Sequence, residues 1–216
     1  MIDYQPLQAP QLTRIDGGPN GRRYKTPEGN LYPSVTTIFS LNKSALDDWR
    51  KKVGEEAANK ISARAAHQGT FIHKLCEDVI KGQAVDPGYI YRDLWNGFRP
   101  VVEQITTVFA SETPLYSDIF KVAGTIDCLG YWQGELSIID FKTSRSLKKR
   151  EYIKNYFMQE AAYSVMVKER FGLDARKLVT LIAVENEEPQ VFVERRDDWL
   201  PSFVDLRKQY KAEVGD

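Results

Sequence analysis

The sequence predicts an α/β core with a helical N-terminal region folded over it. Residues 34–110 show mainly the apolar spacing of helices, residues 112–144 read as three consecutive strands, and helical and strand patterns alternate thereafter. With 216 residues, 42% of them hydrophobic, the chain can bury one substantial core. We therefore expect a single domain over residues 1–216, made of an N-terminal hairpin and helical region, 1–110, and an αβ core, 111–216.

The N-terminal part opens with a stretch, 1–21, whose many Pro, Gln and Gly residues predict irregular structure. Residues 22–32 read as a small hairpin that turns at Glu28-Gly29-Asn30. Ser34 is a suitable N-cap for a short helix, 35–41. Further helical patterns cover 45–53, 55–66, 70–81 and 89–110, where Gly97 and Pro100 predict a kink or two segments.

The remaining elements follow from the same patterns. A strand, 112–119, leads into a hairpin over residues 122–144, and a basic connection, 145–150, leaves it. Apolar spacing then predicts a long helix, 151–171. Two strands, 177–184 and 189–194, and a closing helix, 199–213, complete the chain.

The hairpin over residues 122–144 carries the most informative side chains. With Gln133-Gly134 as a two-residue turn, Asp127 lies opposite Asp140 and Thr125 opposite Lys142. Because side chains alternate along a strand, Asp127, Asp140 and Lys142 share one face. The other face collects apolar residues, namely Ile126, Cys128, Ile139 and Phe141.

Two carboxylates that face each other across a ladder repel one another. A hard divalent cation between Asp127 and Asp140 removes this repulsion and uses their oxygens as ligands. The hairpin therefore predicts a metal site with Lys142 beside it. The alternative is a solvated hairpin face, against which stands the apolar run that precedes Asp140.

Charge and cysteine content narrow the class of protein. Lys+Arg and Asp+Glu both number 30, so binding of a polyanion would need locally concentrated positive charge. Cys76 and Cys128 are the two cysteines, which is too few for a four-cysteine zinc or iron–sulfur site. No stretch resembles a membrane span or a signal peptide. We expect a cytoplasmic protein that does not contact membranes.

Two helical stretches could converge on the hairpin. His73 lies at the edge of the apolar stripe of residues 70–81, with Glu77 one turn further along the same side. Gln159 and Tyr163 share one face of the later helix. Surface exposure or a core hydrogen bond is the alternative role for His73, and core packing is the alternative for Tyr163.

Four motifs now occur in the order typical of the PD-(D/E)xK nuclease superfamily. They are Gly69-x3-His73, Gly124-Thr-Ile-Asp127, Ile139-Asp140-Phe141-Lys142-Thr143 and Gln159-x3-Tyr163. The chain resembles the RecB-like exonuclease branch, and the run YPSVTTIFS at residues 32–40 makes it most similar to the mitochondrial genome maintenance exonuclease group and its phage and bacterial relatives. The resemblance covers roughly residues 30–185, and proline is missing before Asp127.

The resemblance implies a restriction-endonuclease-like core, which is a mixed central sheet flanked by helices, with a helical N-terminal region arching over the active site. It further implies one or two Mg²⁺ or Mn²⁺ ions and no iron–sulfur cluster. The implied metal ligands are His73, Asp127, Asp140 and the Phe141 carbonyl, with Glu77 as a partner of His73. Lys142 would hold the attacking water and stabilise the oxyanion, while Gln159 and Tyr163 would position water or phosphate. The strand register leaves the place of Glu112 open.

The implied activity is a metal-dependent DNA exonuclease acting on single-stranded ends, in DNA replication, recombination or repair. An endonuclease of the same superfamily and a non-cutting nucleic-acid-binding module stay as alternatives. Polarity, the choice between DNA and RNA, oligomeric state and a phage or prophage origin stay open. Basic side chains near aromatic ones are the expected nucleic-acid contacts, with solvated charge as the alternative. They are Trp49, Arg50, Lys51, Lys52, Arg145, Lys148, Lys149 and Arg150.

Overall fold

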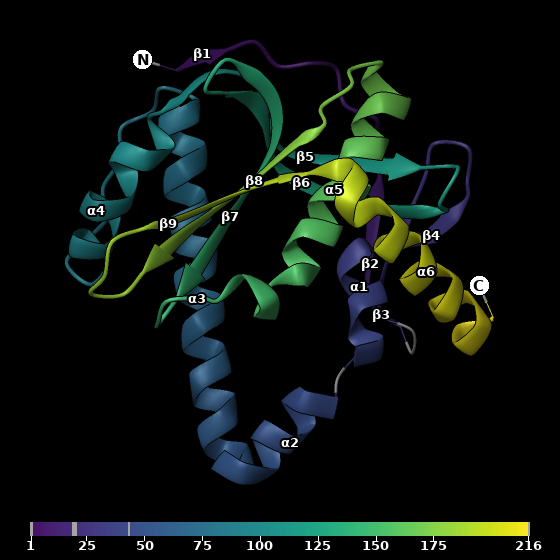
Figure 1. Cartoon of the computed structure of the whole chain (residues 1–216), viewed down its shortest axis with the longest axis horizontal. Coiled ribbons are helices and arrows are strands. Elements are labelled where there is room, and N and C mark those ends of the chain that lie inside the picture. The colour runs from purple at the N-terminus through teal and green to yellow at the C-terminus, as the bar shows by residue number, and fades with distance from the viewer. Residues whose placement is uncertain (1, 19–20, 43, 216) are drawn as a thin grey trace.

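A mixed six-stranded sheet forms the centre of the molecule and carries helices on both faces (Figure 1). The computed structural model describes residues 2–18, 21–42 and 44–215, with only the backbone of residues 42 and 44–46. The order of strands is β1-β5-β6-β7-β8-β9. Their bounds are Asp3–Tyr4 for β1, Ile105–Ser117 for β5, Val122–Trp132 for β6, Glu135–Ser144 for β7, Lys177–Val184 for β8 and Gln190–Arg195 for β9. The predicted α/β class is confirmed.

The sheet is mixed because two kinds of connection build it. Strands β5, β6 and β7 form an antiparallel meander, whereas β7 and β8 run parallel and are joined through α5, Lys154–Phe171. Strand β9 returns antiparallel to β8, and β1 adds a short parallel edge to β5. A parallel pair needs such a helical crossover, which brings α5 over β7.

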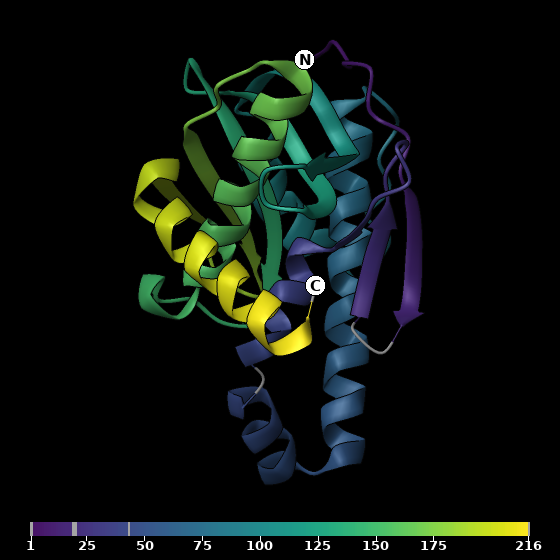
Figure 2. The same ribbon diagram turned by 90° about the vertical axis from the view of Figure 1, so that its right-hand side faces the viewer.

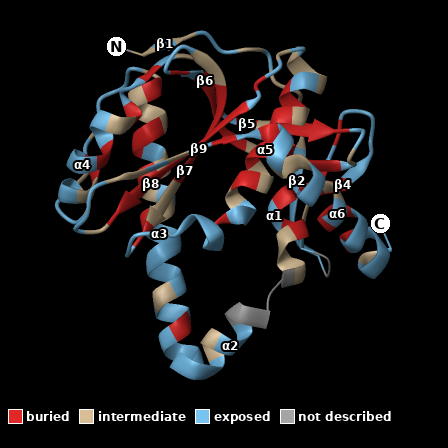
Figure 3. Cartoon of the chain, viewed as in Figure 1, coloured by how far each residue is buried: buried red, intermediate tan, exposed pale blue. Residues whose placement is uncertain are grey.

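Each face of the sheet buries its own hydrophobic cluster. Helices α5 and α6, Arg196–Val214, cover one face, where Ile138 and Phe203 are fully buried. Helices α3, Glu55–Ile80, and α4, Arg92–Val102, cover the other face, where Ile139 and Phe98 are fully buried. The layers are separated in Figure 2, and the buried strands stand out in Figure 3. The alternation of Ile138 and Ile139 between the two clusters is the period of two of a strand buried on both sides.

A small second sheet consists of β2, Thr13–Gly18, β3, Gly21–Lys25, and β4, Leu31–Pro33. The hairpin predicted over residues 22–32 is confirmed by the β3–β4 pairing. The prediction of irregular structure over 1–21 is wrong for 13–18, because β2 pairs with β3. All six residues of β2 are exposed, and two of them are glycines, so no apolar periodicity marks it.

The helical region begins at Ser34, whose hydroxyl accepts the Thr37 N–H at 3.0 Å as the predicted N-cap. Helix α1, Val35–Ile38, continues as a 3₁₀ turn, Phe39–Asn42, and leads to α2, Ser44–Val53. The two helices predicted over 55–66 and 70–81 are one helix, α3. Helix α2 and the first half of α3 project away from the sheet as a helical hairpin (Figures 1 and 2).

The helix predicted over residues 89–110 is too long. Helix α4 ends at Val102, and residues from Ile105 onward belong to β5. The run Ile105-Thr-Thr-Val108 is β-branched, and pairing with β6 outweighs the helical spacing there. The helices predicted over 151–171 and 199–213 correspond to α5 and α6. Within the described residues, no helix combines the length and apolar character needed to cross a bilayer.

Candidate metal centre

The β6–β7 hairpin has the predicted register. Paired residues run from Trp132 with Glu135 to Cys128 with Ile139, around a turn in which Gln133 and Gly134 both have positive φ, 50° and 77°. Positive φ at both central residues is typical of a type I′ turn, whose twist matches that of the flanking strands. The recorded pairing ends at Cys128 and Ile139, and the two aspartates follow immediately on their strands.

Asp127 bridges the two strands where their ladder ends. Its Oδ2 accepts the Phe141 N–H at 2.9 Å, and the residue is 8% exposed. The carboxylate thus takes the place of a backbone acceptor and is held between β6 and β7. A charged hydrogen bond of this kind stabilises the carboxylate in a fixed orientation.

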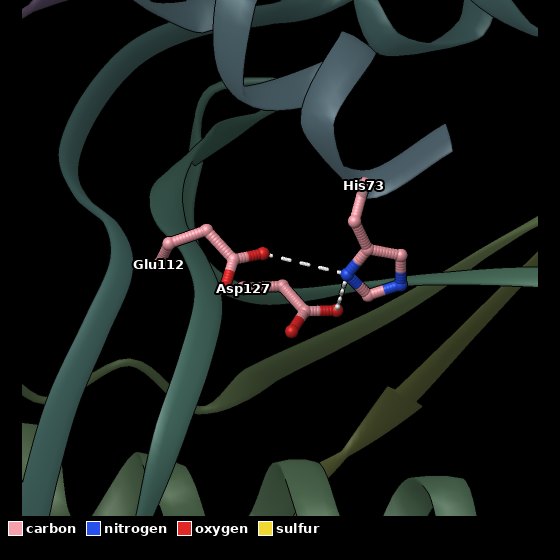
Figure 4. Close-up of side chains that lie close together, drawn as sticks. All are labelled: His73, Glu112 and Asp127. Atoms are coloured by element: carbon pink, nitrogen blue, oxygen red, sulfur yellow. Dashed lines mark hydrogen bonds and ion pairs between the residues drawn. The ribbon is translucent and has the colours of Figure 1, made fainter. Parts of the chain in front are cut away.

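His73 approaches the same point from α3. Its Nε2 lies 2.6 Å from the Phe141 carbonyl oxygen, to which the Nε2–H donates. Its Nδ1 faces two carboxylates, 3.4 Å from Glu112 Oε1 and 3.7 Å from Asp127 Oδ2 (Figure 4). A hydrogen bond to one ring nitrogen that leaves the other free is the arrangement of metal-binding imidazoles.

The electrostatics of His73 reflect this environment. Burial disfavours the charged imidazolium, but Asp127 and Glu112 outweigh that cost and raise the pKa of His73 to about 9. The position of Nδ1 therefore attracts positive charge strongly. A proton satisfies it in the absence of a metal ion, and a divalent cation would compete with that proton.

Glu112 is the member of the cluster that sequence reasoning left open. On β5 it lies between the Ser111–Cys128 and Thr113–Ile126 pairs, which places it opposite Asp127 on the neighbouring strand. Its φ is 47°, a strained value for a residue with a side chain. The signal that could have identified Glu112 is its place on β5, the strand that pairs with β6. An acidic residue opposite Asp127 on a neighbouring strand must lie close to it.

Glu77 does not contact His73, contrary to the prediction. Its carboxylate binds Lys81 and, at 3.3 Å, Lys74, both on the same helix. These lysines lie one turn to either side of Glu77 and capture it locally. Glu112 takes the place beside His73 that was expected for Glu77.

The three ligand atoms of His73, Glu112 and Asp127 lie within 4.8 Å of one another. Two carboxylates supply oxygen donors that suit both Mg²⁺ and Mn²⁺, and the imidazole nitrogen suits Mn²⁺ better than Mg²⁺. The Phe141 carbonyl, which was also predicted as a ligand, accepts the His73 N–H. These side chains fit a divalent ion.

Asp140, which is buried, and Lys142, which is half-buried, form an ion pair next to this cluster. Burial, together with repulsion from Asp127, raises the pKa of Asp140 to about 6 against the attraction of Lys142. Burial would lower the pKa of Lys142, but Asp140 and Asp127 outweigh it and raise that pKa above its ordinary value. Without a metal, Lys142 is therefore an ammonium group. Its Nζ also lies 3.5 Å from the Phe141 carbonyl oxygen.

Helix α5 supplies the side chains that support this pair. Gln159 Nε2 donates to Asp140 Oδ1 at 3.2 Å, so the predicted proximity of Gln159 to the aspartates is present. The Tyr156 ring lies 5.2 Å from Lys142 Nζ, close enough for a cation–π contact. Tyr163 is 3% exposed and packs where Gly124 has no side chain, since a Cβ there would lie 2.8 Å from its ring.

The predicted nucleic-acid contacts fall into separate places. Arg50 in α2 binds Glu55 at 3.0 Å and Asn59 at 2.6 Å. Arg150 binds Glu194 through two nitrogens, at 2.5 and 2.6 Å, which ties the connection after β7 to β9. The remaining residues of the set are exposed or half-buried around these two positions, namely Trp49, Lys51, Lys52, Arg145, Lys148 and Lys149.

Sequence comparison identifies distant relatives. No family model matches the chain. The mitochondrial genome maintenance exonuclease 1 of Homo sapiens is 23% identical over 150 residues, which cover 62% of this chain and 43% of that protein. Its counterpart in Mus musculus is 26% identical over 154 residues, covering 62% and 44%. The chain thus spans less than half the length of the curated relatives it matches.

Among solved structures, an exonuclease candidate from Eubacterium rectale aligns with a TM-score of 0.49 and 13% identity, over 69% of this chain and 65% of that one. The fold and the site define a class: an α/β protein with a mixed sheet flanked by helices and with acidic and histidine side chains gathered where β6 and β7 stop pairing. Within that class, the sequence similarity makes the chain a distant homologue of mitochondrial genome maintenance exonuclease 1.

Proposed function

We propose that the protein is a metal-dependent nuclease that hydrolyses phosphodiester bonds at the ends of single-stranded DNA. The observation that carries the proposal is the cluster of His73, Glu112 and Asp127 beside the Asp140–Lys142 ion pair. Homology to an exonuclease supports it independently. A purely structural role does not account for three acidic groups gathered around one lysine and one imidazole.

Each part of the cluster has a role in this reaction. A bound divalent ion would neutralise phosphate oxygens and lower the pKa of an attacking water. Nδ1 of His73, Glu112 and Asp127 would hold that ion, and Asp140 adds a further carboxylate at its edge. The Lys142 ammonium stabilises negative charge that develops on the phosphate and keeps the attacking water in place. Gln159 orients Asp140 by its hydrogen bond.

The substrate assignment rests on local charge. The protein has no net positive charge, but a groove beside Lys142 is lined by Lys60, Arg64, Arg145 and Lys148. A polyanion is attracted to such a locally basic surface. The name of the homologues, genome maintenance exonuclease, supports DNA as the substrate and strand ends as the place of cleavage.

The test compares the protein with its Lys142→Ala variant on linear and circular single-stranded DNA, with Mg²⁺, Mn²⁺ or EDTA. We expect metal-dependent loss of linear strands, with circles intact and the variant inactive but still able to bind DNA. Strands labelled at one end or the other report the polarity. Cleavage by the variant at the wild-type rate would contradict the role of Lys142.

The other outcomes select the alternatives. Cleavage of circles would identify an endonuclease of the same superfamily. Binding without cleavage under every metal condition would identify a nucleic-acid-binding module. The ion pair of Asp140 and Lys142 speaks against that module, because removing the Asp140 charge fully and the Lys142 charge partly from water is costly unless the pair serves a function.

A further inference from the structure

A groove of ≈ 390 Å³ lies beside the candidate metal centre, between α3 and the end of β7. Thr143, which follows Lys142 directly, lines it, as does Tyr156, whose ring contacts the Lys142 ammonium at 5.2 Å. The volume lies in the range of small-ligand sites. The groove therefore opens next to Lys142, whose ammonium group is expected to face the scissile phosphate.

Gln68 of α3 lines this groove with an unusual side chain. The residue is 4% exposed, yet among the described residues none donates a hydrogen bond to its amide or accepts one from it. The amide atoms of Gln68 still reach solvent, through the cavities that the residue lines. A primary amide has two donor hydrogens and a carbonyl acceptor. With the rest of the side chain buried, Gln68 presents these groups to a ligand in the groove.

Charge differs sharply on the two sides of Gln68. Arg64 donates to both oxygens of Glu185, at 3.1 and 3.0 Å, and these two residues with Gln68 line both the groove and a second pocket of ≈ 860 Å³. The groove side carries the cations Arg145 and Lys148, which form no ion pair with any residue the structure describes.

The second pocket has the opposite character. Asp93, Glu187 and Glu188 line it in addition to the shared Glu185. Phosphates are attracted to the groove and repelled from this pocket. Arg64, Gln68 and Glu185 thus form a wall between a basic and an acidic cavity, and a nucleic-acid strand can follow the basic side only.

We propose that the groove holds one nucleotide unit of the single-stranded substrate, that the Gln68 amide hydrogen-bonds this nucleotide, and that Arg64 leaves Glu185 to bind its phosphate. The inference rests on the proposed nuclease function and adds a binding residue to it. A strand in the groove supplies hydrogen-bond partners for the Gln68 amide. At Arg64, a phosphate of the strand replaces the Glu185 carboxylate. Glu185 then acts as a competitor of the substrate for Arg64.

The test measures binding of a fluorescein-labelled oligothymidylate in EDTA by anisotropy, together with the melting temperature of the free protein. Gln68→Met should raise the Kd about tenfold, whereas the melting temperature should stay nearly equal, because the amide that is removed hydrogen-bonds no residue the structure describes. Gln83→Met, at an exposed glutamine after α3, is the matched control and should change neither. A fall in melting temperature with unchanged Kd would show that Gln68 is structural.

Two further variants protect the test from a folding defect. Arg64 is 60% exposed in its side chain, so Arg64→Gln leaves folding intact and should weaken binding and reduce the salt slope by about one. Glu185→Gln should strengthen binding, since it releases Arg64. If both variants weakened binding, or both strengthened it, the exchange at Arg64 would be overturned.

The failure of this inference differs from the failure of the proposed function. If the unmodified protein bound no oligonucleotide and cut none, both would fall. If it bound and cut while Gln68→Met and Arg64→Gln matched it in Kd, the groove assignment alone would fall.

Discussion

The two ends of the β6–β7 hairpin contrast in structure and in purpose. Near the turn, the ladder is regular from Trp132–Glu135 to Cys128–Ile139, and the side chains are mostly apolar and buried. At the other end the pairing stops, and Asp127 fills the place of a ladder partner. We call the end at the turn the closed end and the end at Asp127 and Asp140 the open end. Packing on both faces of the sheet stabilises the closed end, whereas charged side chains gather at the open end.

The contrast shows how one hairpin combines stability with a reactive site. Charges at the open end are destabilising by themselves, since burial raises the pKa of Asp140 to about 6 and Glu112 adopts φ 47°. The closed end carries no comparable strain apart from its turn. We therefore expect substitutions at the open end to change chemistry with little loss of stability, and those at the closed end to do the reverse.

The largest effect should come from Asp127→Asn at the open end. The cleavage rate should fall about a thousandfold, equivalent to about 4 kcal/mol, because a metal ligand is lost. The amide oxygen can still accept the Phe141 N–H, so the melting temperature at pH 9.5, where His73 is mostly neutral, should change little. Initial rates and melting curves measure both, and a variant with wild-type rate and full Mn²⁺ binding would refute the ligand assignment.

The second effect concerns pH in the metal-free protein. Because the folded-state pKa of His73 is raised from 6.5 to about 9, its contribution to the free energy of unfolding is complete below pH 6.5 and is lost as pH rises through about 9. The change amounts to about 3 kcal/mol.

Urea unfolding in EDTA at pH 6 and at pH 9.5 measures this change. The His73→Gln variant is the control and should lack the difference attributable to His73. Identical pH profiles for the two proteins would contradict the interaction of His73 with Asp127 and Glu112.

Glu112→Gly separates strain from function. Removal of the carboxylate should lower metal affinity about 10- to 100-fold, while relief of the positive φ should raise the free energy of unfolding by about 1 kcal/mol at pH 9.5, where His73 is mostly neutral. Gln133→Gly is the matched control at the closed end, since Gln133 has φ 50°. It should gain similar stability with unchanged metal affinity by calorimetry. Equal metal affinity in both variants would remove Glu112 from the site.

The smallest effect on activity should come from Gly130→Ala at the closed end. A Cβ there would lie 2.6 Å from the Thr107 carbonyl oxygen, so the free energy of unfolding should fall by about 2 kcal/mol. Activity per folded molecule should be unchanged. Gly97→Ala is the control, because no atom lies within 4 Å of its added Cβ and helix propensity improves. Loss of specific activity in folded Gly130→Ala would show that the two ends are coupled.

Much of the fold could be read from local patterns. The register of β6 and β7 follows from a two-residue turn and a period of two, and the Ser34 cap follows from one hydroxyl at a helix start. Strand β2 could not be read, because it buries no side chain. The end of α4 was missed because the pairing of Ile105 with Trp132 is a contact between distant parts of the chain.

The candidate site divides in the same way. Asp127, Asp140 and Lys142 stand on one hairpin, so spacing along the sequence was enough to bring them together. Glu112 and Glu77 show the limit of that reasoning. A side chain one helical turn from His73 is captured by neighbouring lysines, whereas one 39 residues away reaches the imidazole.

By itself, the sequence determined the α/β class, the hairpin and its charged end, because alternation, turn chemistry and capping act over a few residues. Only the tertiary structure decided which carboxylate joins His73, that Arg150 is held by Glu194, and that Gln68 lines the groove next to Thr143. Those outcomes depend on the packing of α3 and β5 against the hairpin. Long-range packing sets the distances between side chains, and no local pattern encodes them.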